Sequence, residues 1–346
     1  MNQHKPLIYD LSLSELEHWL STQGEPKFRA KQIYVGLYQN FRTEVGEITT
    51  LPKALRGVLT EHFDMEGISP VRKIQSNNGL TSKTLFELQD GCLIETVLMM
   101  YDERRTVCIS AQSGCGLGCT FCATGQMGLS RNLTSGEIVA QVIYHARLLA
   151  KTDDRVTNVV LMGMGEPFQN YEDVMAAITR LNDPDGFGLG ARRMTISTVG
   201  IVPKIKTFAD ENSQVNLAVS LHTVDDDLRS ELIPVNRKYP VSSVLSACRY
   251  YTMKTNRRVT FEYALIDGVN DSEKDALALA QQIRGMLCHV NLIALNPTRK
   301  YNRSGSRVDQ VQAFYDVLES HHIPCTIRLR RGIEIGAGCG QLAAGG

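Results

Sequence analysis

The chain has 346 residues, of which 43% are hydrophobic, a length and composition that suit one large globular domain with an appendage. Its 37 basic and 37 acidic residues cancel, so net charge alone predicts no nucleic-acid partner, although local basic patches could still bind one. With no apolar stretch long enough to span a membrane, no apolar signal region in residues 1–6 and nine cysteines, we expect a cytoplasmic protein with reduced thiols.

Residues 1–68 show the apolar spacing of helices, most clearly in residues 12–20 and 28–36. Ser12 followed by Glu15 is typical of the capping box that begins a helix. Basic side chains cluster in the second segment, at Lys27, Arg29 and Lys31. A solvated helix surface explains them as well as an RNA contact does. We therefore expect a helical N-terminal accessory domain, for which RNA binding is the functional interpretation.

From residue 69 the hydrophobic period changes to two, which is typical of half-buried strands. The dipeptides Asn78-Gly79 and Asp90-Gly91 predict hairpin turns between three such strands. The expected strands are 71–75, 84–88 and 92–98. They would form a small β-meander over residues 69–104 that links the helical domain to the rest of the chain.

Strands and helices alternate from residue 105 onward, which predicts a parallel sheet with crossover helices. Thr134 and Glu137 form a second capping box, at the start of the clearest of these helices. Six strand–helix units are too few to close an eight-stranded barrel. We therefore expect an α/β fold, a partial and open (βα)6 barrel over residues 105–346, with its sites at the carboxyl ends of the strands. The expected strands are 106–111, 158–162, 193–198, 215–221, 259–264, 289–295 and 325–330.

Cys115, Cys119 and Cys122 follow the first barrel strand in a C-x3-C-x2-C spacing on a glycine-rich loop. Thiolates are the usual ligands of iron–sulfur clusters. Zinc would need a fourth ligand at a short spacing, which is missing here, and three buried cysteines would pack poorly on such a loop. The loop resembles the cluster-binding loop of radical S-adenosylmethionine (SAM) enzymes. That resemblance implies a [4Fe–4S] cluster with SAM on its open iron, transfer of one electron to SAM, and release of a 5′-deoxyadenosyl radical.

Polar residues stand at the ends of several expected strands, where SAM would bind. Gly165 and Glu166 resemble the G-G-E-P-like segment of radical SAM enzymes, and Glu166 could accept a hydrogen bond from the SAM amino group. The other candidates are Ser197, then Ser220 with Leu221 and His222, and Asn296. Any one of these polar residues could instead cap the following helix. Their recurrence at one rim favours contacts with the ribose, carboxylate and adenine of SAM.

Two further cysteines stand apart from the loop. Cys339 lies between glycines seven residues from the end, which predicts a mobile tail with an exposed thiol. An incidental cysteine in a frayed terminus is the usual interpretation of such a position. Cys108 lies on the first barrel strand, seven residues before the loop. Strand alternation does not decide whether its side chain faces the barrel interior.

Six motifs together point to one family: Cys115-x3-Cys119-x2-Cys122, Arg131-Asn-Leu-Thr-x2-Glu137, Met162-Gly-Met-Gly-Glu166, Val219-Ser-Leu-His222, Leu295-Asn-Pro297 and Cys339-Gly-Gln-Leu342. Across nearly all its length the chain resembles the radical SAM ribosomal RNA adenine methyltransferases, the RlmN/Cfr family. Gly336 and Gly338 stand where alanine-like residues are commoner in that family, which adds flexibility and removes no functional atom.

The resemblance implies a relay that uses two SAM molecules per turnover. One SAM methylates Cys339, and the radical from the second SAM takes hydrogen from that methyl group. The methylene radical adds to adenine C2 and tethers the RNA to the protein. A base then removes the C2 proton, and Cys108 attacks Cys339, which releases the product and leaves a disulfide. Glu95 matches the family position assigned as proton acceptor, although a carboxylate on the outer face of the meander needs no special role.

The implied substrates are an adenosine in the peptidyl-transferase centre of 23S rRNA, before the ribosome is fully assembled, and an anticodon-loop adenosine of tRNA. An external donor such as flavodoxin or ferredoxin would supply electrons. Methylation of C8, the Cfr-type resistance activity, is the main alternative, and the Gly165-Glu-Pro167 segment favours C2. Two other classes stay open: a radical SAM maturase or mutase for a small molecule, and a non-enzymatic iron–sulfur or RNA-binding protein.

Overall fold

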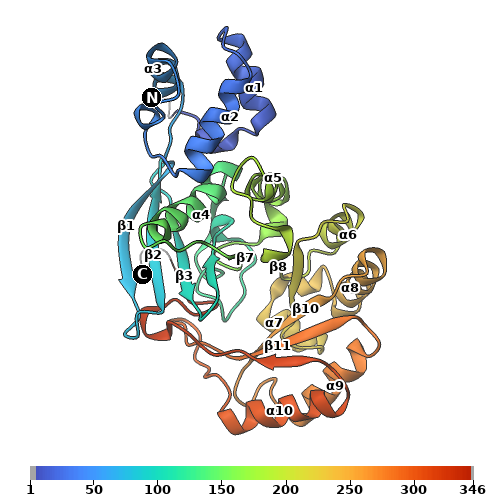
Figure 1. Cartoon of the computed structure of the whole chain (residues 1–346). Helices are drawn as coiled ribbons and strands as arrows, with labels where there is room; N and C mark the ends of the chain where they lie inside the picture. Colours follow the sequence, from blue (N-terminus) through green and yellow to red (C-terminus); the bar gives the residue numbers. More distant parts are fainter. Residues whose placement is uncertain (1–4, 344–346) are drawn as a thin grey trace.

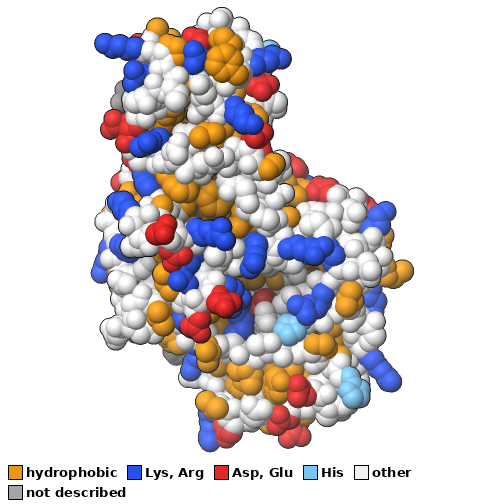
Figure 2. All heavy atoms as spheres, viewed as in Figure 1, with side chains coloured by type: hydrophobic (Ala, Val, Ile, Leu, Met, Phe, Trp, Pro, Cys, Tyr) orange, Lys and Arg blue, Asp and Glu red, His pale blue; other side chains and the backbone are white. Residues whose placement is uncertain are grey.

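The computed structural model of the chain describes residues 5–343. A small helical domain stands at one end of a larger α/β domain, in which helices lie around a curved sheet (Figure 1). The face drawn in Figure 2 is hollowed near its centre, and Lys and Arg side chains gather around the hollow. None of the helices in the described residues is long and apolar enough to cross a membrane.

The N-terminal domain, as far as the structure describes it, is built on α1 (Leu13–Thr22), α2 (Phe28–Tyr34) and α3 (Lys53–His62). The predicted capping box begins α1: the Ser12 hydroxyl accepts the Glu15 N–H at 3.2 Å, and the Glu15 carboxylate accepts the Ser12 N–H at 2.7 Å. Leu16 and Leu20 are fully buried on one face of this helix. Burying a leucine contributes about 1.5–3 kcal/mol, so this face fixes α1 in the domain core.

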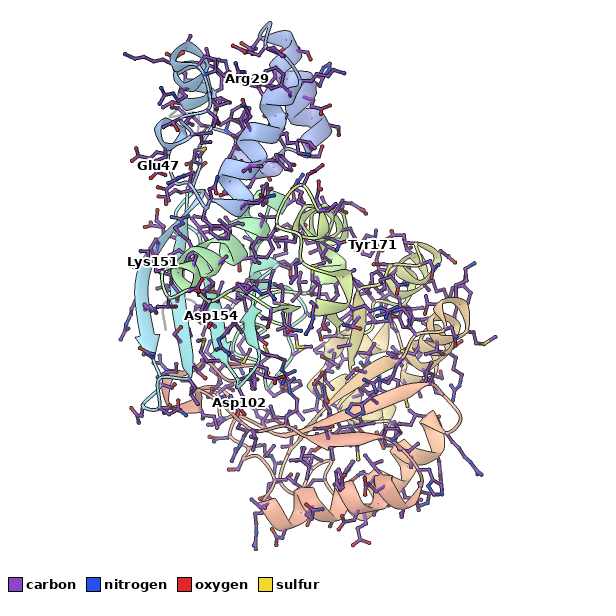
Figure 3. The ribbon with its side chains drawn as sticks, viewed as in Figure 1. Arg29, Glu47, Asp102, Lys151, Asp154 and Tyr171 are labelled. Carbon is purple, nitrogen blue, oxygen red and sulfur yellow. The ribbon has the colours of Figure 1, made fainter. Side chains whose placement is uncertain are left out.

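Polar contacts join the N-terminal domain to the barrel. Lys31 pairs with Asp185 at 2.7 Å, and the Asp10 carboxylate accepts a backbone N–H at 2.7 Å at the start of α4 (Ser135–Ala150). Arg29, labelled in Figure 3, donates to a backbone carbonyl of its own domain at 3.2 Å. Two of the three predicted basic residues are therefore engaged within the protein, and this face offers less free positive charge than the sequence predicts.

Ten strands within the described residues form one sheet, in the order β1-β2-β3-β4-β7-β8-β9-β10-β11-β12. The three pairs from β1 to β4 are antiparallel. The six pairs from β4 to β12 are parallel. The predicted fold class is confirmed: a partial (βα)6 barrel preceded by a helical region and a meander. The strands are β1 (Ile68–Gln75), β2 (Thr81–Leu88), β3 (Leu93–Met100), β4 (Arg105–Cys108), β7 (Asn158–Leu161), β8 (Met194–Thr198), β9 (Asn216–Ser220), β10 (Val259–Leu265), β11 (Cys288–Ala294) and β12 (Cys325–Ile327).

The crossover helices lie outside this sheet (Figure 1) and cover its apolar outer face. They connect parallel strands, as the alternating pattern predicts. After α4 they are α5 (Tyr171–Asn182), α6 (Val202–Asp210), α7 (Asp226–Leu232), α8 (Val241–Thr255), α9 (Glu273–Ile283) and α10 (Val308–Ser320).

The meander continues the barrel sheet instead of standing apart as a separate linker. β3 pairs antiparallel with β4, which places Val97 opposite Cys108. The hydrogen-bonded ladder therefore runs from the meander directly into the barrel. The predicted domain boundaries at residues 68 and 104 stay a prediction.

Two of the predicted barrel strands are shorter in the structure. The strand expected over 106–111 ends at Cys108, and the strand expected over 325–330 ends at Ile327. After Cys108 the chain enters a separate hairpin of β5 (Gln112–Cys115) and β6 (Gly128–Asn132), which the sequence does not predict.

The predicted capping box of α4 is present. The Thr134 hydroxyl accepts the Glu137 N–H at 3.2 Å, and the Glu137 carboxylate accepts the Thr134 N–H at 2.9 Å. Arg131 on β6 donates to both oxygens of Glu137 at 2.8 Å. The first turn of α4 is thereby tied to the hairpin that carries the cysteine loop.

We expect mild acid to destabilise the fold through His145 in α4. Its side chain is fully buried, its Nε2 lies 2.7 Å from the Thr96 hydroxyl, and burial lowers its pKa from 6.5 to about 3. The unfolded chain therefore binds a proton that the folded protein does not. Stability from this group is complete above about pH 6.5 and is lost as the pH falls towards 3, by up to about 1.4 kcal/mol per pH unit.

Thermal unfolding at pH 7 and pH 5 measures this effect. The wild type should lose more stability between the two conditions than His145→Gln, while the exposed His18→Gln should behave as the wild type. An equal loss in His145→Gln would show that other groups cause the acid sensitivity.

Candidate active site

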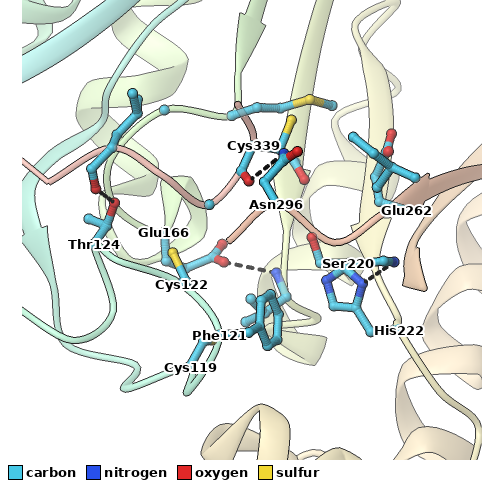
Figure 4. A pocket seen from close by; sticks show the side chains of 18 of the residues that line it. Cys119, Phe121, Cys122, Thr124, Glu166, Ser220, His222, Glu262, Asn296 and Cys339 are labelled. Atoms are coloured by element: carbon cyan, nitrogen blue, oxygen red, sulfur yellow. Dashed lines mark hydrogen bonds between the residues drawn. The ribbon is translucent and has the colours of Figure 1, made fainter. Parts of the chain in front are cut away.

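A cavity opens at the carboxyl ends of the parallel strands, between the cysteine loop and the C-terminal tail (Figure 4). Sites in barrels of parallel strands lie at this end. Six of the seven residues predicted to bind SAM line this cavity, together with Cys119, Cys122 and Cys339. The six are Gly165, Glu166, Ser197, Ser220, His222 and Asn296.

The cysteine loop connects the two strands of the β5–β6 hairpin. Gly114 has φ +76°, and a Cβ at this position would lie 2.0 Å from the Gly128 carbonyl oxygen, so glycine is needed for the two strands to approach. Cys115 and Cys119 are buried among apolar side chains, and Cys122 is half-buried. All three thiols are free of disulfides.

The donor chemistry of this loop fits an iron–sulfur cluster. Burial raises the pKa of Cys115 to about 11 and raises that of Cys119 further, and the neighbouring Cys122 adds to both shifts. Ligation requires thiolates, so a metal bound here must displace protons. In residues 5–343 no three His, Cys, Asp or Glu side chains converge on a position for a single metal ion. Each thiolate of a cubane binds its own iron, so a cluster does not require such convergence.

Glu166 lines the cavity (Figure 4), and backbone groups already bind its carboxylate. One oxygen accepts the Phe168 N–H at 3.0 Å and the other accepts the Val199 N–H at 2.9 Å. Burial raises the pKa of Glu166 to about 7. Beside it, Gly165 has φ +95°, and a Cβ there would lie 2.5 Å from the Gln112 side chain. Glu166 thus fastens the loop after β7 to the end of β8, and any bond to the SAM amino group would use its remaining lone pairs.

The ends of β8 and β9 place hydroxyl and imidazole groups in the cavity. Ser197 and Ser220 line it, and the Nδ1 of His222 accepts the Ala264 N–H at 2.9 Å. Burial lowers the pKa of His222 to about 3, so its ring is neutral. Leu221 is fully buried and does not line the cavity, because successive side chains of an extended segment point to opposite sides. Any contact of Leu221 with SAM would come from its backbone.

Asn296 connects the cavity rim with the tail. Its Nδ2 donates to the Cys339 carbonyl at 3.1 Å (Figure 4). Its Oδ1 is buried and has no hydrogen-bond partner in the described residues. A buried acceptor without a donor costs about 1–3 kcal/mol. This oxygen therefore fits a donor group on a molecule bound in the cavity.

Two hydrogen bonds hold the tail just after Cys339, at Gly340 and at Leu342. The Ala123 N–H donates to the Gly340 carbonyl at 2.8 Å, and the Thr124 hydroxyl donates to the Leu342 carbonyl at 2.7 Å. The Cys339 residue itself is exposed, as the sequence predicts. The predicted free tail is not what the structure shows, because these bonds hold it against the cysteine loop.

Cys108 faces the cavity side of the sheet, which strand alternation alone does not decide. Its residue is buried, and its sulfur lies beside the backbone N–H of Met162, a residue of the cavity wall. Burial and the nearby Cys339 thiol raise the pKa of Cys108 to about 12. The two isolated cysteines therefore share one neighbourhood, while both remain free thiols.

Glu95 does not lie on an outer face of the meander. It is 5% exposed, its Oε1 lies 2.8 Å from the Lys83 ammonium, and its Oε2 accepts the Ala343 N–H at 2.9 Å. The interpretation of Glu95 as an unremarkable surface carboxylate is therefore wrong. Its role as proton acceptor stays a prediction.

Arg229 and the pair of Arg328 with Glu262 are absent from the sequence-based predictions. Arg328 and Glu262 line the cavity and lie 3.4 Å apart. Arg229 is fully buried beneath the rim, where burial lowers its pKa to about 10. A single arginine in a short helix gives no local signal of burial. Arg229 donates to the carbonyls of Val199, Ser220 and Leu221.

Two family models match the chain. The radical SAM superfamily matches residues 109–280, and the ribosomal RNA large subunit methyltransferase N-terminal domain matches residues 8–65. The first contains the cysteine loop and most of the cavity, and the second coincides with the helical domain.

Full-length relatives are also found. A probable dual-specificity RNA methyltransferase RlmN of Chloroflexus aurantiacus is 51% identical over 347 residues, which cover 97% of this chain and 92% of that protein. The protein of the same name in Geobacillus kaustophilus is 49% identical and covers 98% and 93%. The crystal structure of a radical SAM methyltransferase from Sphaerobacter thermophilus matches with a TM-score of 0.96 and 51% identity, over 98% of this chain and 99% of that one.

Proposed function

The chain belongs to the RlmN family of radical SAM RNA methyltransferases, and we propose that it methylates C2 of adenosine through a methyl group carried on Cys339. One observation carries this proposal: Cys339 lines the same cavity as Cys119 and Cys122 of the cysteine loop. A radical SAM maturase or mutase for a small molecule needs no such cysteine, and a non-enzymatic protein needs no SAM site. Both alternatives lose support.

The proposed substrates are the peptidyl-transferase-centre adenosine of 23S rRNA, before the ribosome is fully assembled, and an anticodon-loop adenosine of tRNA. Relatives that are 47–51% identical are described as dual-specificity RNA methyltransferases. The Lys and Arg side chains around the hollow in Figure 2 suit a polyanionic partner. We place the reaction in the cytoplasm, with electrons from an external donor such as flavodoxin or ferredoxin.

We assign separate roles to the cysteine loop and to the rim residues of the cavity. When bound to Cys115, Cys119 and Cys122, a [4Fe–4S] cluster would supply the electron that cleaves SAM. The rim residues around Ser220 and Asn296 would hold SAM beside it, and two SAM molecules would bind in turn for each product. The second SAM and the disulfide step are inferred from the family relationship.

Cys339 must lose its proton to accept the first methyl group, because the thiolate is the nucleophile. Although the residue as a whole is exposed, desolvation of its thiol by the surrounding cavity wall raises the pKa of Cys339. The Arg328 guanidinium opposes this shift and favours the thiolate. Cys108, with a pKa of about 12, stays protonated and unreactive at neutral pH. It would attack only when the tail brings a sulfur-bound adduct to it, and the product would leave as Cys108 and Cys339 form a disulfide.

Mass spectrometry of nucleosides tests this function. Ribosomal RNA and tRNA that lack the modification are incubated with anaerobically reconstituted enzyme, SAM and reductant, then digested. We expect 2-methyladenosine from the wild type and none from Cys339→Ala. The appearance of 8-methyladenosine instead would establish the Cfr-type alternative, and SAM cleavage with no methylated RNA would overturn the proposed substrate class.

A further inference from the structure

Lys83 and Glu95 form a buried ion pair beneath the C-terminal tail. They stand on neighbouring strands of the meander, β2 and β3, and their charged atoms lie 2.8 Å apart. Their side chains are only 13% and 6% exposed. A charged pair removed from water needs good geometry and further hydrogen bonds to be favourable, and here the second Glu95 oxygen accepts the Ala343 N–H at 2.9 Å.

The pair touches the tail on both sides of Cys339. On one side, Glu95 holds the backbone of Ala343. On the other, a Cβ added to Gly336 would lie 3.4 Å from the Lys83 ammonium, so this group packs against the chain before Cys339. The contacts from the cysteine loop and from Asn296 hold the segment between these points. Glu95 and Lys83 are therefore the charged side chains of the meander that contact the tail around Cys339. Met100 of the meander binds the chain earlier, through Arg331.

We propose that the Lys83–Glu95 pair is a latch that keeps the Cys339 tail in the cavity and that loosens when Glu95 becomes neutral. A hydrogen bond to a carboxylate is roughly twice as strong as one between neutral groups. Protonation removes the attraction to Lys83 and weakens the bond from Ala343 at the same time. Lys83 is thus a positioning residue, which acts through Glu95 and the tail.

The latch would order the last steps of the reaction, and this timing rests on the proposed function. The adduct formed by radical addition must first give one electron to a one-electron acceptor, for which an iron–sulfur cluster is the chemical class. The C2–H bond then breaks, its electron pair stays in the purine ring and its proton passes to the Glu95 carboxylate. The same proton neutralises the latch. The tail is then free to carry the Cys339 sulfur towards Cys108. As the S–S bond forms, the bond between the Cys339 sulfur and the methylene carbon breaks and its electron pair stays on the carbon. This carbon takes the proton of the Cys108 thiol to become the methyl group. This exchange follows loss of the C2 proton.

Hydrogen–deuterium exchange of the full-length, cluster-loaded enzyme without RNA tests the latch. Glu95→Gln imitates the neutral acid, and Lys83→Met removes the partner charge. In both variants we expect the amides of residues 338–343 to exchange at least about tenfold faster than in the wild type, while strand β8 is unchanged. Lys83→Arg keeps the charge and should restore slow exchange. Glu87→Gln, an exposed change on β2, is the matched control.

If the amides of residues 338–343 exchange as slowly in both Glu95→Gln and Lys83→Met as in the wild type, the proposed latch is wrong. If Glu95→Gln does not fold, the comparison of Lys83→Met with Lys83→Arg decides the question alone. The nucleoside assay is a separate readout: absence of 2-methyladenosine from the wild type would refute the proposed function and leave the exchange result valid.

Discussion

Replacement of Cys119 by alanine is expected to abolish the iron–sulfur absorption and the SAM cleavage of the reconstituted protein together. Cys119 is 7% exposed and lines the cavity beside Cys122. Loss of one of three thiolates leaves too few ligands to hold a cubane. We expect 5′-deoxyadenosine formation to fall by more than about 100-fold, since removal of even an outer partner of a metal ligand costs about 10–100-fold.

Cys92→Ala is the matched control, because Cys92 is a free, half-buried cysteine of the meander outside the cavity. It should keep its iron content and its rate of SAM cleavage. Both are measured after anaerobic reconstitution, by iron analysis and by chromatography of 5′-deoxyadenosine. A Cys119→Ala protein with full iron content would show that Cys119 is not a ligand of the cluster.

Replacement of the two isolated cysteines is expected to give opposite results with RNA. Cys108→Ala should accumulate a covalent protein–RNA adduct and lose multiple turnover, because no thiol remains to attack Cys339. Cys339→Ala should form no adduct, because it cannot carry the methyl group. Denaturing gels with labelled RNA separate the two outcomes, and mass spectrometry of resting wild-type protein should find the methyl group on Cys339.

Release of the methylated product through a disulfide also requires the two cysteines to come close together. To form a disulfide, the Cα atoms of Cys108 and Cys339 must come within about 4.4–6.8 Å of each other. The double variant of both cysteines should form no adduct, which places Cys339 before Cys108 in the sequence of steps. Free methylated RNA from Cys108→Ala would show that another group resolves the adduct, and Cys108 would then be only a residue of the core.

The cavity could be predicted from sequence because parallel strands share one edge. Polar residues after successive strands, such as Glu166, Ser220 and Asn296, must meet there whatever the details of the helices. Leu221 shows the limit of reading a motif as a unit: it sits between two cavity residues, yet its side chain is fully buried on the other side. A motif identifies a segment, whereas alternation decides which of its side chains reach the ligand.

The structure also differs from the sequence-based predictions in the β5–β6 hairpin, in the C-terminal tail and at Glu95. The β5–β6 hairpin is short and rich in glycine, so it has no hydrophobic period to detect. The glycines around Cys339 favour a mobile tail, but Thr124 and Ala123, more than 200 residues away in sequence, bind it. The sequence alone also allows Glu95 to be a surface charge, because the residue whose N–H it binds, Ala343 in the tail, is 248 residues away in sequence.

The uninterrupted ladder from β1 to β12 determines which parts of this enzyme are exchangeable. A protein trimmed to residues 105–346 would present β4 as a bare edge strand, open to aggregation, and would also lack Glu95. The helical domain is different, since all ten strands of the described sheet begin at Ile68 or later. It joins the rest through side-chain contacts such as Phe41 with Phe187 and Lys31 with Asp185. A chimaera that swaps substrates between relatives should therefore be spliced before Ile68, so that the meander is inherited with the barrel.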